Sequence, residues 1–262
     1  MELTLYQVDA FTTNLFGGNP AAIIPLNKWL PDELMQAIAL ENNLSETCFI
    51  VPDSHADFHI RWFTPTKEVN LCGHATLATA HVLFRHLGFA KDEIKFSSAS
   101  GLLTVKNKLE NISMDFPATP VNTLELSDTL KDISSSLPQE VYTAGEDILF
   151  IYGTQSEIEN IQINEPKLKC LPYRGLICSA PGNDVDFVSR FFAPAFGISE
   201  DPVTGSAHTA LAPYWSKKLH KETLIAEQLS ARKGRLNCTI APERVHIAGQ
   251  AVTYMIGKIF ID

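Results

Sequence analysis

The sequence has no excess of positive charge and no long apolar run. Its 262 residues carry 21 Lys and Arg against 30 Asp and Glu, for a formal net charge of −9. Nucleic acids and anionic membranes bind basic faces, so we expect neither as a partner. No apolar stretch approaches the roughly 20 residues that span a bilayer. Residues 1–7 lack the positive and apolar segments of a secretion signal, so we expect none.

Cysteine is scarce, and several nucleotide-binding and catalytic motifs are absent. The five cysteines are odd in number and widely spaced, which favours a reduced, cytoplasmic protein over a disulfide framework. There is no Walker A loop, no G-x-G-x-x-G motif and no G-x-S-x-G motif around Ser206. His55 and His59 would share one face of a strand, but no third ligand is evident, so we expect no metal.

What the sequence does contain is one module written twice. Residues 57–65 read D-F-x-x-R-W-F-x-P, and residues 186–194 read D-F-x-x-R-F-F-x-P. Residues 68–75 then read E-x-x-x-C-G-H-A, and residues 200–207 read E-x-x-x-T-G-S-A. The offset is 129 residues up to the prolines and 132 residues through the helix starts, which indicates one three-residue insertion. Duplicated α/β units have a cleft between their halves, where small-molecule sites form.

The repeat predicts two similar halves, residues 1–117 with 254–262 and residues 118–253. A last strand at 256–261 has no counterpart after Phe116, so we expect it to return to the first half. The helix expected at 74–87 is apolar almost all round, which predicts a helix wrapped by a sheet. The matching helix at 206–219 contains Pro213, which predicts a kink or a break. The fold class is therefore α/β.

The two helix starts are candidate anion sites. In each, a small residue precedes a glycine (Gly73, Gly205), a short polar side chain and an alanine. The glycine removes the side chain that would block approach, so backbone N–H groups and the helix dipole can hold an anion such as a carboxylate. The alternative is an ordinary N-cap at Thr204 and a tight turn at Gly73. The pairing of two related starts favours the anion site.

Titratable residues near these starts are the candidates for catalysis. His74 lies in the first helical turn, where the dipole favours a neutral, proton-exchanging imidazole; the alternative is a buried structural histidine. His208, one turn into the other helix, is a weaker candidate. Glu46, in a polar loop before an apolar strand, is either a general acid and base in a cleft or a solvated glutamate. Asp201 is a site acid or a turn-capping acid.

Two further positions have structural alternatives. The acids Glu68 and Glu200 are equivalent in the repeat, which predicts a structural role for at least one of them. Cys72 is either a reactive thiol, since a helix start favours the thiolate, or a packed small residue. Its repeat counterpart is Thr204, so a pair of opposed thiols is absent.

These residues lie in segments that resemble the phenazine-biosynthesis (PhzF-like) isomerase family, within the diaminopimelate epimerase-like fold. The resemblance extends over essentially the whole chain. The segments that carry it are QVDAF at 7–11, GNP at 18–20, LSET at 44–47, LCGHAT at 71–76, SRFFAP at 189–194 and EDPVTGSAH at 200–208.

The resemblance implies two pseudo-symmetric halves, each a barrel-like mixed β-sheet around a central helix. It implies an isomerase that uses no cofactor and forms a homodimer. Glu46 matches the proton-shuttling carboxylate, and His74, Asp201 and Ser206 match other site residues. Asn19, Cys72, Gly73, Thr204 and Gly205 are the further expected substrate contacts. Epimerases of the wider fold carry paired cysteines, so Thr204 argues against inversion at a saturated carbon.

The sequence therefore predicts an isomerase that moves a proton between carbons of a small carboxylate bound between the halves. Two alternatives stay open at this point. One is a racemase or epimerase that depends on Cys72, and the other is a protein that binds small carboxylates without turnover. The family does not identify the substrate.

Overall fold

The computed structural model describes residues 1–109 and 111–261. The chain divides into two compact units, which are described separately: unit 1 comprises Met1–Asp115 and Ala248–Asp262, and unit 2 comprises Phe116–Ile247. The expected crossing at residues 117 and 118 lies two residues beyond this division. The expected return at residue 254 falls inside a strand that begins at Ala251.

Unit 1 is a mixed sheet whose strands pair largely in the order of the sequence, with the last strand, β18, beside the first. β1 is antiparallel to β2, β2 is parallel to β3, and β3 is antiparallel to β4. β4 is parallel to β6, which leads through two antiparallel pairs to β7 and β8. The strands are β1 (Glu2–Ala10), β2 (Asn19–Pro25), β3 (Glu46–Pro52), β4 (Phe58–Phe63), β5 (Glu68–Val69), β6 (Glu93–Ser98), β7 (Gly101–Lys108), β8 (Asn111–Pro117) and β18 (Ala251–Phe260).

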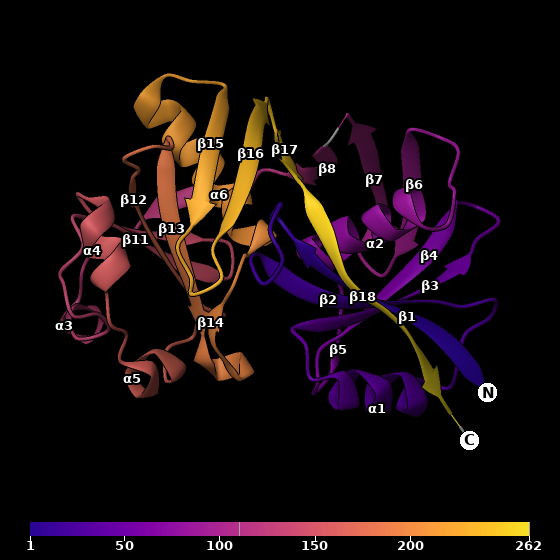
Figure 1. Cartoon of the computed structure of the whole chain (residues 1–262). Coiled ribbons are helices and arrows are strands. Elements are labelled where there is room, and N and C mark those ends of the chain that lie inside the picture. Colours follow the sequence, from indigo (N-terminus) through magenta and orange to yellow (C-terminus); the bar gives the residue numbers. More distant parts are fainter. Residues whose placement is uncertain (110, 262) are drawn as a thin grey trace. The chain divides into compact units, whose positions relative to one another are not determined.

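The helix α2 (Gly73–Arg85) runs through the middle of this sheet (Figure 1). It contacts strands from both ends of the pairing order, β18 and β1 on one side and β7 on the other, so the sheet curls around it. Its side chains from His74 to Ala80 are all buried, as the all-round apolar pattern predicted. The helix α1 (Asp32–Asn42) covers the outer face over a core that includes Met35, Phe49 and Phe63.

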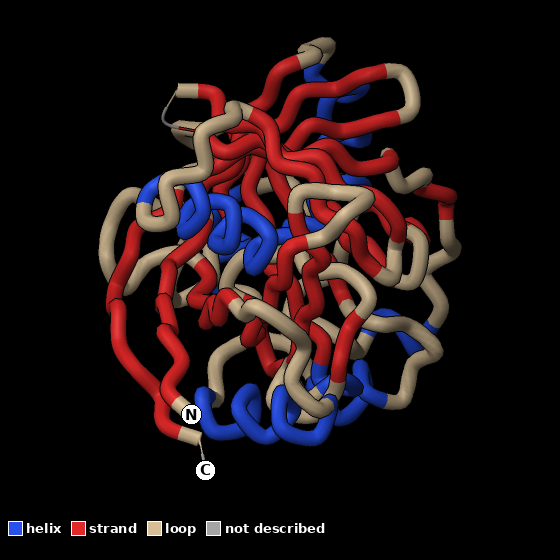
Figure 2. The backbone as a smooth tube through the Cα atoms, turned by 90° about the vertical axis from the view of Figure 1, so that its right-hand side faces the viewer, coloured by secondary structure: helices blue, strands red, loops and turns tan. Residues whose placement is uncertain are grey.

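The last strand, β18, completes unit 1. It pairs with β1 in antiparallel fashion from Glu2 opposite Phe260 to Ala10 opposite Ala251. The two ends of the chain therefore lie side by side (Figure 2), and the N–H of Ile261 donates to the carbonyl of Met1.

Unit 2 repeats the pairing scheme of unit 1. β10 is antiparallel to β11, β11 parallel to β12, β12 antiparallel to β13, β13 parallel to β15, and β15 antiparallel to β16. The strands are β9 (Val121–Thr123), β10 (Glu140–Ala144), β11 (Asp147–Ile151), β12 (Leu176–Pro181), β13 (Phe187–Ala193), β14 (Ile198–Asp201), β15 (Thr223–Gln228), β16 (Gly234–Ala241) and β17 (Arg244–Gly249). The short helices are α3 (Asp128–Lys131), α4 (Gln155–Asn160), α5 (Glu165–Lys169) and η1 (Pro194–Phe196).

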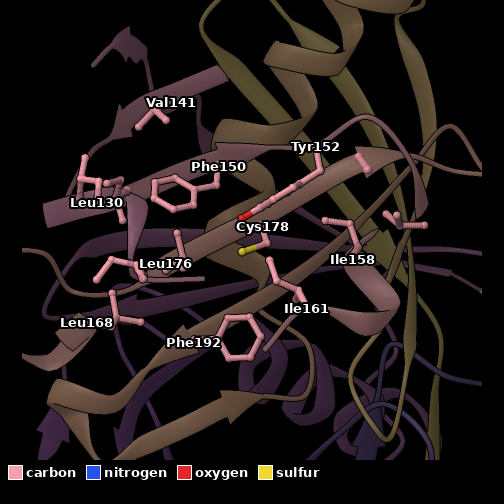
Figure 3. Close-up of a cluster of buried hydrophobic side chains, with 14 of the residues drawn as sticks. Leu130, Val141, Phe150, Tyr152, Ile158, Ile161, Leu168, Leu176, Cys178 and Phe192 are labelled. Carbon is pink, nitrogen blue, oxygen red and sulfur yellow. The ribbon is translucent and has the colours of Figure 1, made fainter. Parts of the chain in front are cut away.

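The inner helix of unit 2, α6 (Gly205–Leu219), continues through Pro213, so of the two predicted outcomes the break is wrong and the kink stays a prediction. Proline has no N–H for the carbonyl of Thr209, four residues earlier. That carbonyl instead accepts a hydrogen bond from the N–H of Thr119 at 3.1 Å. On the other side of the sheet, short helices bury a second core around Phe150, Tyr152 and Phe192 (Figure 3).

The repeated sequence forms the same contacts in each unit. Asp57 accepts the backbone N–H of Lys95 and pairs with Lys91, and Asp186 does the same with Ile225 and Lys221. The repeat-equivalent acids also have matching partners: Arg61 forms two hydrogen bonds with Glu68, and Arg190 forms two with Glu200. Both acids therefore have the structural role that the repeat predicted for at least one.

Each unit is thus a curled mixed sheet around one central helix, which is the predicted α/β fold class. The three-residue insertion adds η1, which ends at Gly197 in a left-handed conformation. Across the described residues, no helix combines the length and the apolar character needed to cross a membrane.

Candidate functional site

In unit 1, Glu46 lies at the start of a buried strand. It is the first residue of β3, opposite Ala21 in the parallel pair with β2. Its side chain is only 12% exposed, so it is not a solvated loop glutamate. The sequence placed it in a loop because its polar neighbours hide the strand pairing that begins there.

His74 is the partner of this carboxylate. Its Nε2 lies 2.9 Å from Oε2 of Glu46, and its side chain is 6% exposed. The Asn19 amide Nδ2 lies 3.1 Å from Nδ1 of the ring and can donate to it. With the amide in this orientation, Nδ1 accepts and a neutral ring carries its proton on Nε2, toward Glu46. The helix start favours this neutral form because the dipole opposes a positive ring.

The Glu46 Oε2 atom has no hydrogen bond within the described part of the chain, although it is buried. The 2.9 Å approach of His74 is close enough, but the atoms are not aligned as a hydrogen bond requires. A buried carboxylate oxygen without a hydrogen bond costs free energy, so it points to a group that binds or reacts there.

Cys72 stands at the N-cap of α2, directly before Gly73. Its Sγ lies 3.5 Å from Nδ1 of His74, and its side chain is buried. Its side chain makes no hydrogen bond that caps the helix. Its backbone carbonyl accepts a hydrogen bond from the Thr76 hydroxyl. The thiol is therefore packed against the imidazole.

In unit 2, a positively charged side chain, that of Arg174, lies at the equivalent helix start. With the offset of 129 residues, Ser45 and Glu46 correspond to Arg174 and Gly175. Arg174 donates from Nη2 to Ser206 Oγ at 3.1 Å, and Ser206 is the repeat counterpart of His74. A carboxylate–imidazole pair in one unit thus corresponds to a guanidinium–hydroxyl pair in the other.

Arg174 is held in place by a buried acid. It donates from Nε to Asp147 Oδ1 at 2.8 Å and from Nη2 to Oδ2. Burial lowers the pKa of Arg174, but the hydrogen bonds with Asp147 and the negative charges of the nearby acids together outweigh this and raise the pKa overall. Burial raises the pKa of Asp147, and Arg174 opposes that rise. The guanidinium, whose side chain is 30% exposed, therefore stays charged and partly open to solvent.

Asp201 and Thr204 form a second group at the same helix start. The Thr204 hydroxyl donates to Asp201 Oδ2, and Gln228 donates to the Asp201 carbonyl at 2.7 Å. The Thr204 N–H donates to Oε1 of Gln228 at 2.9 Å. Thr204 is the N-cap residue of α6, as the structural alternative expected, but its side chain makes no cap hydrogen bond. The capping is lost because the hydroxyl is committed to Asp201.

His208 is a structural residue. Its Nδ1 lies 2.9 Å from the carbonyl of Thr204, and burial lowers its pKa to about 4, so it stays neutral near pH 7. His55 and His59 do not belong to a metal-like cluster; within the described ranges, the one group of three such ligands is Glu46, Cys72 and His74.

The predicted residues thus fall into one group in each unit. Asn19, Glu46, Cys72, Gly73 and His74 belong to unit 1; Asp201, Thr204, Gly205 and Ser206 belong to unit 2. Sequence reasoning missed Arg174, Asp147 and Gln228. Extending the repeat backward by the same offset from Asp186 would have matched Arg174 with Ser45, beside Glu46.

Comparison with known proteins places the chain in a family. The sequence profile of the phenazine biosynthesis-like protein family, PhzC-PhzF, matches residues 8–257. An uncharacterized isomerase of Pseudomonas aeruginosa is 48% identical over 261 residues, which cover 100% of both chains. A second uncharacterized isomerase of the same organism is 46% identical over 99% of both chains. The chain therefore belongs to the phenazine biosynthesis-like family.

A solved structure agrees with this membership. The crystal structure of a PhzF-family phenazine biosynthesis protein from Enterococcus faecalis is 43% identical, with a TM-score of 0.96 and 100% of both chains covered. A hydroxyproline epimerase from Agrobacterium vitis is 12% identical with a TM-score of 0.62, over 98% of this chain and 92% of its own, which is a likeness of fold alone. The predictions of family, fold class and isomerase class are confirmed.

Proposed function

We propose that the protein is a cofactor-independent isomerase that moves a proton between two carbons of a small, unsaturated carboxylate. The observation that carries the proposal is the Glu46 carboxylate, buried against His74 with one oxygen lacking a hydrogen bond. A carboxylate held in this way is ready to accept a proton from carbon and return it elsewhere, as general acid–base catalysis requires.

His74 would stabilise the charge that develops on the substrate. The proton on Nε2 of its neutral ring points toward the Glu46 side of the site. Together with the first N–H groups of α2 near Gly73, it supplies fixed dipoles for a developing enolate-like oxygen. Asn19 fixes the tautomer by donating to Nδ1.

The helix start of unit 2 would bind the substrate carboxylate. Ser206, the N–H groups near Gly205 and the charged Arg174 form a donor set that matches an anion. Asp201, fixed by Thr204, would orient a polar substituent. We propose, from the repeat and the family membership, that both helix starts serve one substrate.

The closeness of Cys72 to His74 favours one alternative. A thiol 3.5 Å from an imidazole can act as a base, which would suit a racemase or epimerase. The repeat partner Thr204 cannot supply the second thiol of such an enzyme. If the alternative holds, Cys72→Ala abolishes turnover and thiol alkylation inactivates the protein, whereas the proposed isomerase keeps its activity in Cys72→Ala.

The proposal is tested by deuterium uptake in D₂O. A panel of small unsaturated carboxylates is incubated with wild type, Glu46→Gln and the surface control Glu41→Gln. Exchange at carbon is expected for at least one compound with wild type and Glu41→Gln, and about 10²–10⁴-fold slower exchange with Glu46→Gln. Unchanged exchange in Glu46→Gln would remove Glu46 from its role, and binding without exchange would identify a binding protein.

We also propose a cytoplasmic homodimer. None of the five cysteines forms a disulfide within the described residues, and apolar side chains of β18 are exposed, including Tyr254, Met255 and Ile256. Exposed apolar groups of this kind favour association. Sedimentation should give a dimer that Ile256→Glu weakens; a wild-type monomer would refute this.

A further inference from the structure

The three side chains around the unit 1 helix start have the composition of a zinc-binding site. Glu46, Cys72 and His74 each offer one ligand atom, and these atoms lie within 4.8 Å of one another. Thiolate, imidazole and carboxylate are the three ligand types that bind Zn²⁺, while Mg²⁺ and Ca²⁺ need oxygen donors that one carboxylate cannot provide.

The ligand atoms are close enough to converge on one ion. Ligand atoms about 2.0–2.3 Å from zinc lie roughly 3.3–3.6 Å apart at tetrahedral angles. Around Nε2 of His74, the Glu46 Oε2 atom is at 2.9 Å and the Cys72 Sγ atom at 3.9 Å. The Sγ atom lies closer to Nδ1, at 3.5 Å, so an ion on Nε2 requires the Cys72 side chain to rotate toward that atom. The fourth position would hold water, as in catalytic zinc sites with three protein ligands.

A hydrogen-bond partner for the His74 nitrogen that does not bind the metal is also present. A metal on Nε2 moves the ring proton to Nδ1, which then needs an acceptor. A half-turn of the Asn19 amide presents Oδ1 to Nδ1, across the 3.1 Å that now separates Nδ2 from it. The buried Glu46 Oε2 atom, which lacks a hydrogen bond within the described residues, gains the metal as its partner.

We propose that this cluster binds Zn²⁺, or a similar thiophilic divalent cation, and that the bound ion switches the isomerase off. Binding releases one proton, from the Cys72 thiol, while the His74 proton only changes nitrogen. Coordination of Glu46 through Oε2 occupies the buried oxygen that the proposed function uses, and the positive charge of the ion lowers the basicity of the whole carboxylate, so it no longer takes a proton from carbon. The inhibitory part rests on the proposed function; metal binding itself does not.

The test uses Co²⁺ as a spectroscopic probe for Zn²⁺. Reduced wild-type protein is titrated with Co²⁺ without substrate, beside Cys72→Ser and Cys170→Ser; Cys170 is an exposed free cysteine. We expect one Co²⁺ per chain, a thiolate-to-metal charge-transfer band and loss of the band on adding Zn²⁺. The band should persist in Cys170→Ser and disappear in Cys72→Ser. No band in wild type, or a band that survives in Cys72→Ser, would overturn the proposal.

A second measurement needs no variant. Zn²⁺ should slow iodoacetamide labelling of Cys72 at least tenfold, read peptide by peptide, and leave Cys170 labelling unchanged. Equal labelling of Cys72 with and without Zn²⁺ would also overturn the proposal. Deuterium uptake that Zn²⁺ stops and a chelator restores would support the inhibitory role, and uptake unchanged at saturating Zn²⁺ would refute it. If Glu46→Gln keeps full exchange, the proposed function fails while the cobalt result still decides metal binding.

Discussion

The two inner helices begin with related sequences but have different chemistry beside them. At the start of α2, the acid Glu46 faces His74; at the start of α6, the cation Arg174 reaches Ser206. The surrounding contacts are the same in both units: an aspartate that binds a lysine and a backbone N–H (Asp57, Asp186), and an Arg–Glu ion pair. The repeat therefore preserved the framework, while the positions at the helix starts diverged to a carboxylate–imidazole pair in one unit and a guanidinium–hydroxyl pair in the other, to which we assign the proposed proton transfer and anion binding.

The largest difference should come from replacing the equivalent side chains His74 and Ser206, one in each unit. His74→Gln is expected to lower kcat by about 10² or more, because the dipole that stabilises developing charge is lost. Ser206→Ala should leave kcat near the wild-type value and raise KM about tenfold, as expected for one lost hydrogen bond to the ground state. Steady-state kinetics on a substrate found by the exchange screen separates the kcat effect from the KM effect. If His74→Gln raised KM and left kcat unchanged, the assignment would be contradicted.

Acid should destabilise unit 2 through His208. Thr76 and His208 are repeat-equivalent, and each bonds the carbonyl of its N-cap residue. Burial lowers the His208 pKa from 6.5 to about 4, so the unfolded chain binds the extra proton first as pH falls. Stability is therefore lost between pH 6.5 and 4, by roughly 3 kcal/mol at the lower end.

His208→Thr copies the unit 1 arrangement and should remove this part of the pH dependence. Urea unfolding at pH 7, 6, 5 and 4 measures it, with the buried His81 unchanged in both proteins. The variant is expected to be less stable at pH 7, because a smaller side chain leaves a cavity, but to lose less stability on acidification. An identical pH slope in the two proteins would contradict the assignment of the proton to His208.

The two Arg–Glu pairs should differ in their contribution to stability. Arg190 also donates to the carbonyls of Ile158 and Ile161, whereas Arg61 has the exposed Asp32 as its additional partner. We expect Arg190→Met to cost about 3 kcal/mol of unfolding free energy and Arg61→Met about 1 kcal/mol. Chemical denaturation of both variants tests this; a larger loss for Arg61→Met would show that the additional carbonyl contacts contribute little.

The smallest difference in stability is expected between variants of the equivalent aspartates Asp57 and Asp186. Asp57→Ala and Asp186→Ala remove the same two contacts in the two units, a lysine partner and a backbone N–H. Each should cost about 1 kcal/mol, and the two losses should agree within about 0.5 kcal/mol. Unequal losses of unfolding free energy in matched denaturation curves would mean that equivalent contacts in the two units do not contribute equally to stability.

Much of this arrangement could be predicted from the sequence because the repeat and the helix pattern carry it. The all-round apolar residues of α2 predicted its burial, and the constant offset predicted the equivalent strands. The unbroken course of α6 through Pro213 could not be predicted, because the carbonyl that lacks a proline N–H accepts its hydrogen bond from Thr119, far away in the sequence. Local propensity contains no information about such a contact.

The site was predictable where a side chain lies at a helix start and less so elsewhere. His74, Cys72 and Ser206 follow from the motif, whereas the burial of Glu46 depends on the parallel pairing of β3 with β2. Asp147 lies in β11 and Arg174 in the segment before β12, and neither segment has a recognisable motif. Their ion pair is a tertiary contact that only folding brings together.

The central claim is that unit 1 moves the proton and unit 2 holds the anion. The most direct measurement is of ligand affinity and deuterium uptake at saturating ligand, in Glu46→Gln and Arg174→Gln side by side. The account predicts that Glu46→Gln binds normally but exchanges at least about 10²-fold more slowly, and that Arg174→Gln binds roughly 10-fold or more weakly but exchanges normally once saturated. The reverse pattern, or loss of both properties in both folded variants, would contradict it.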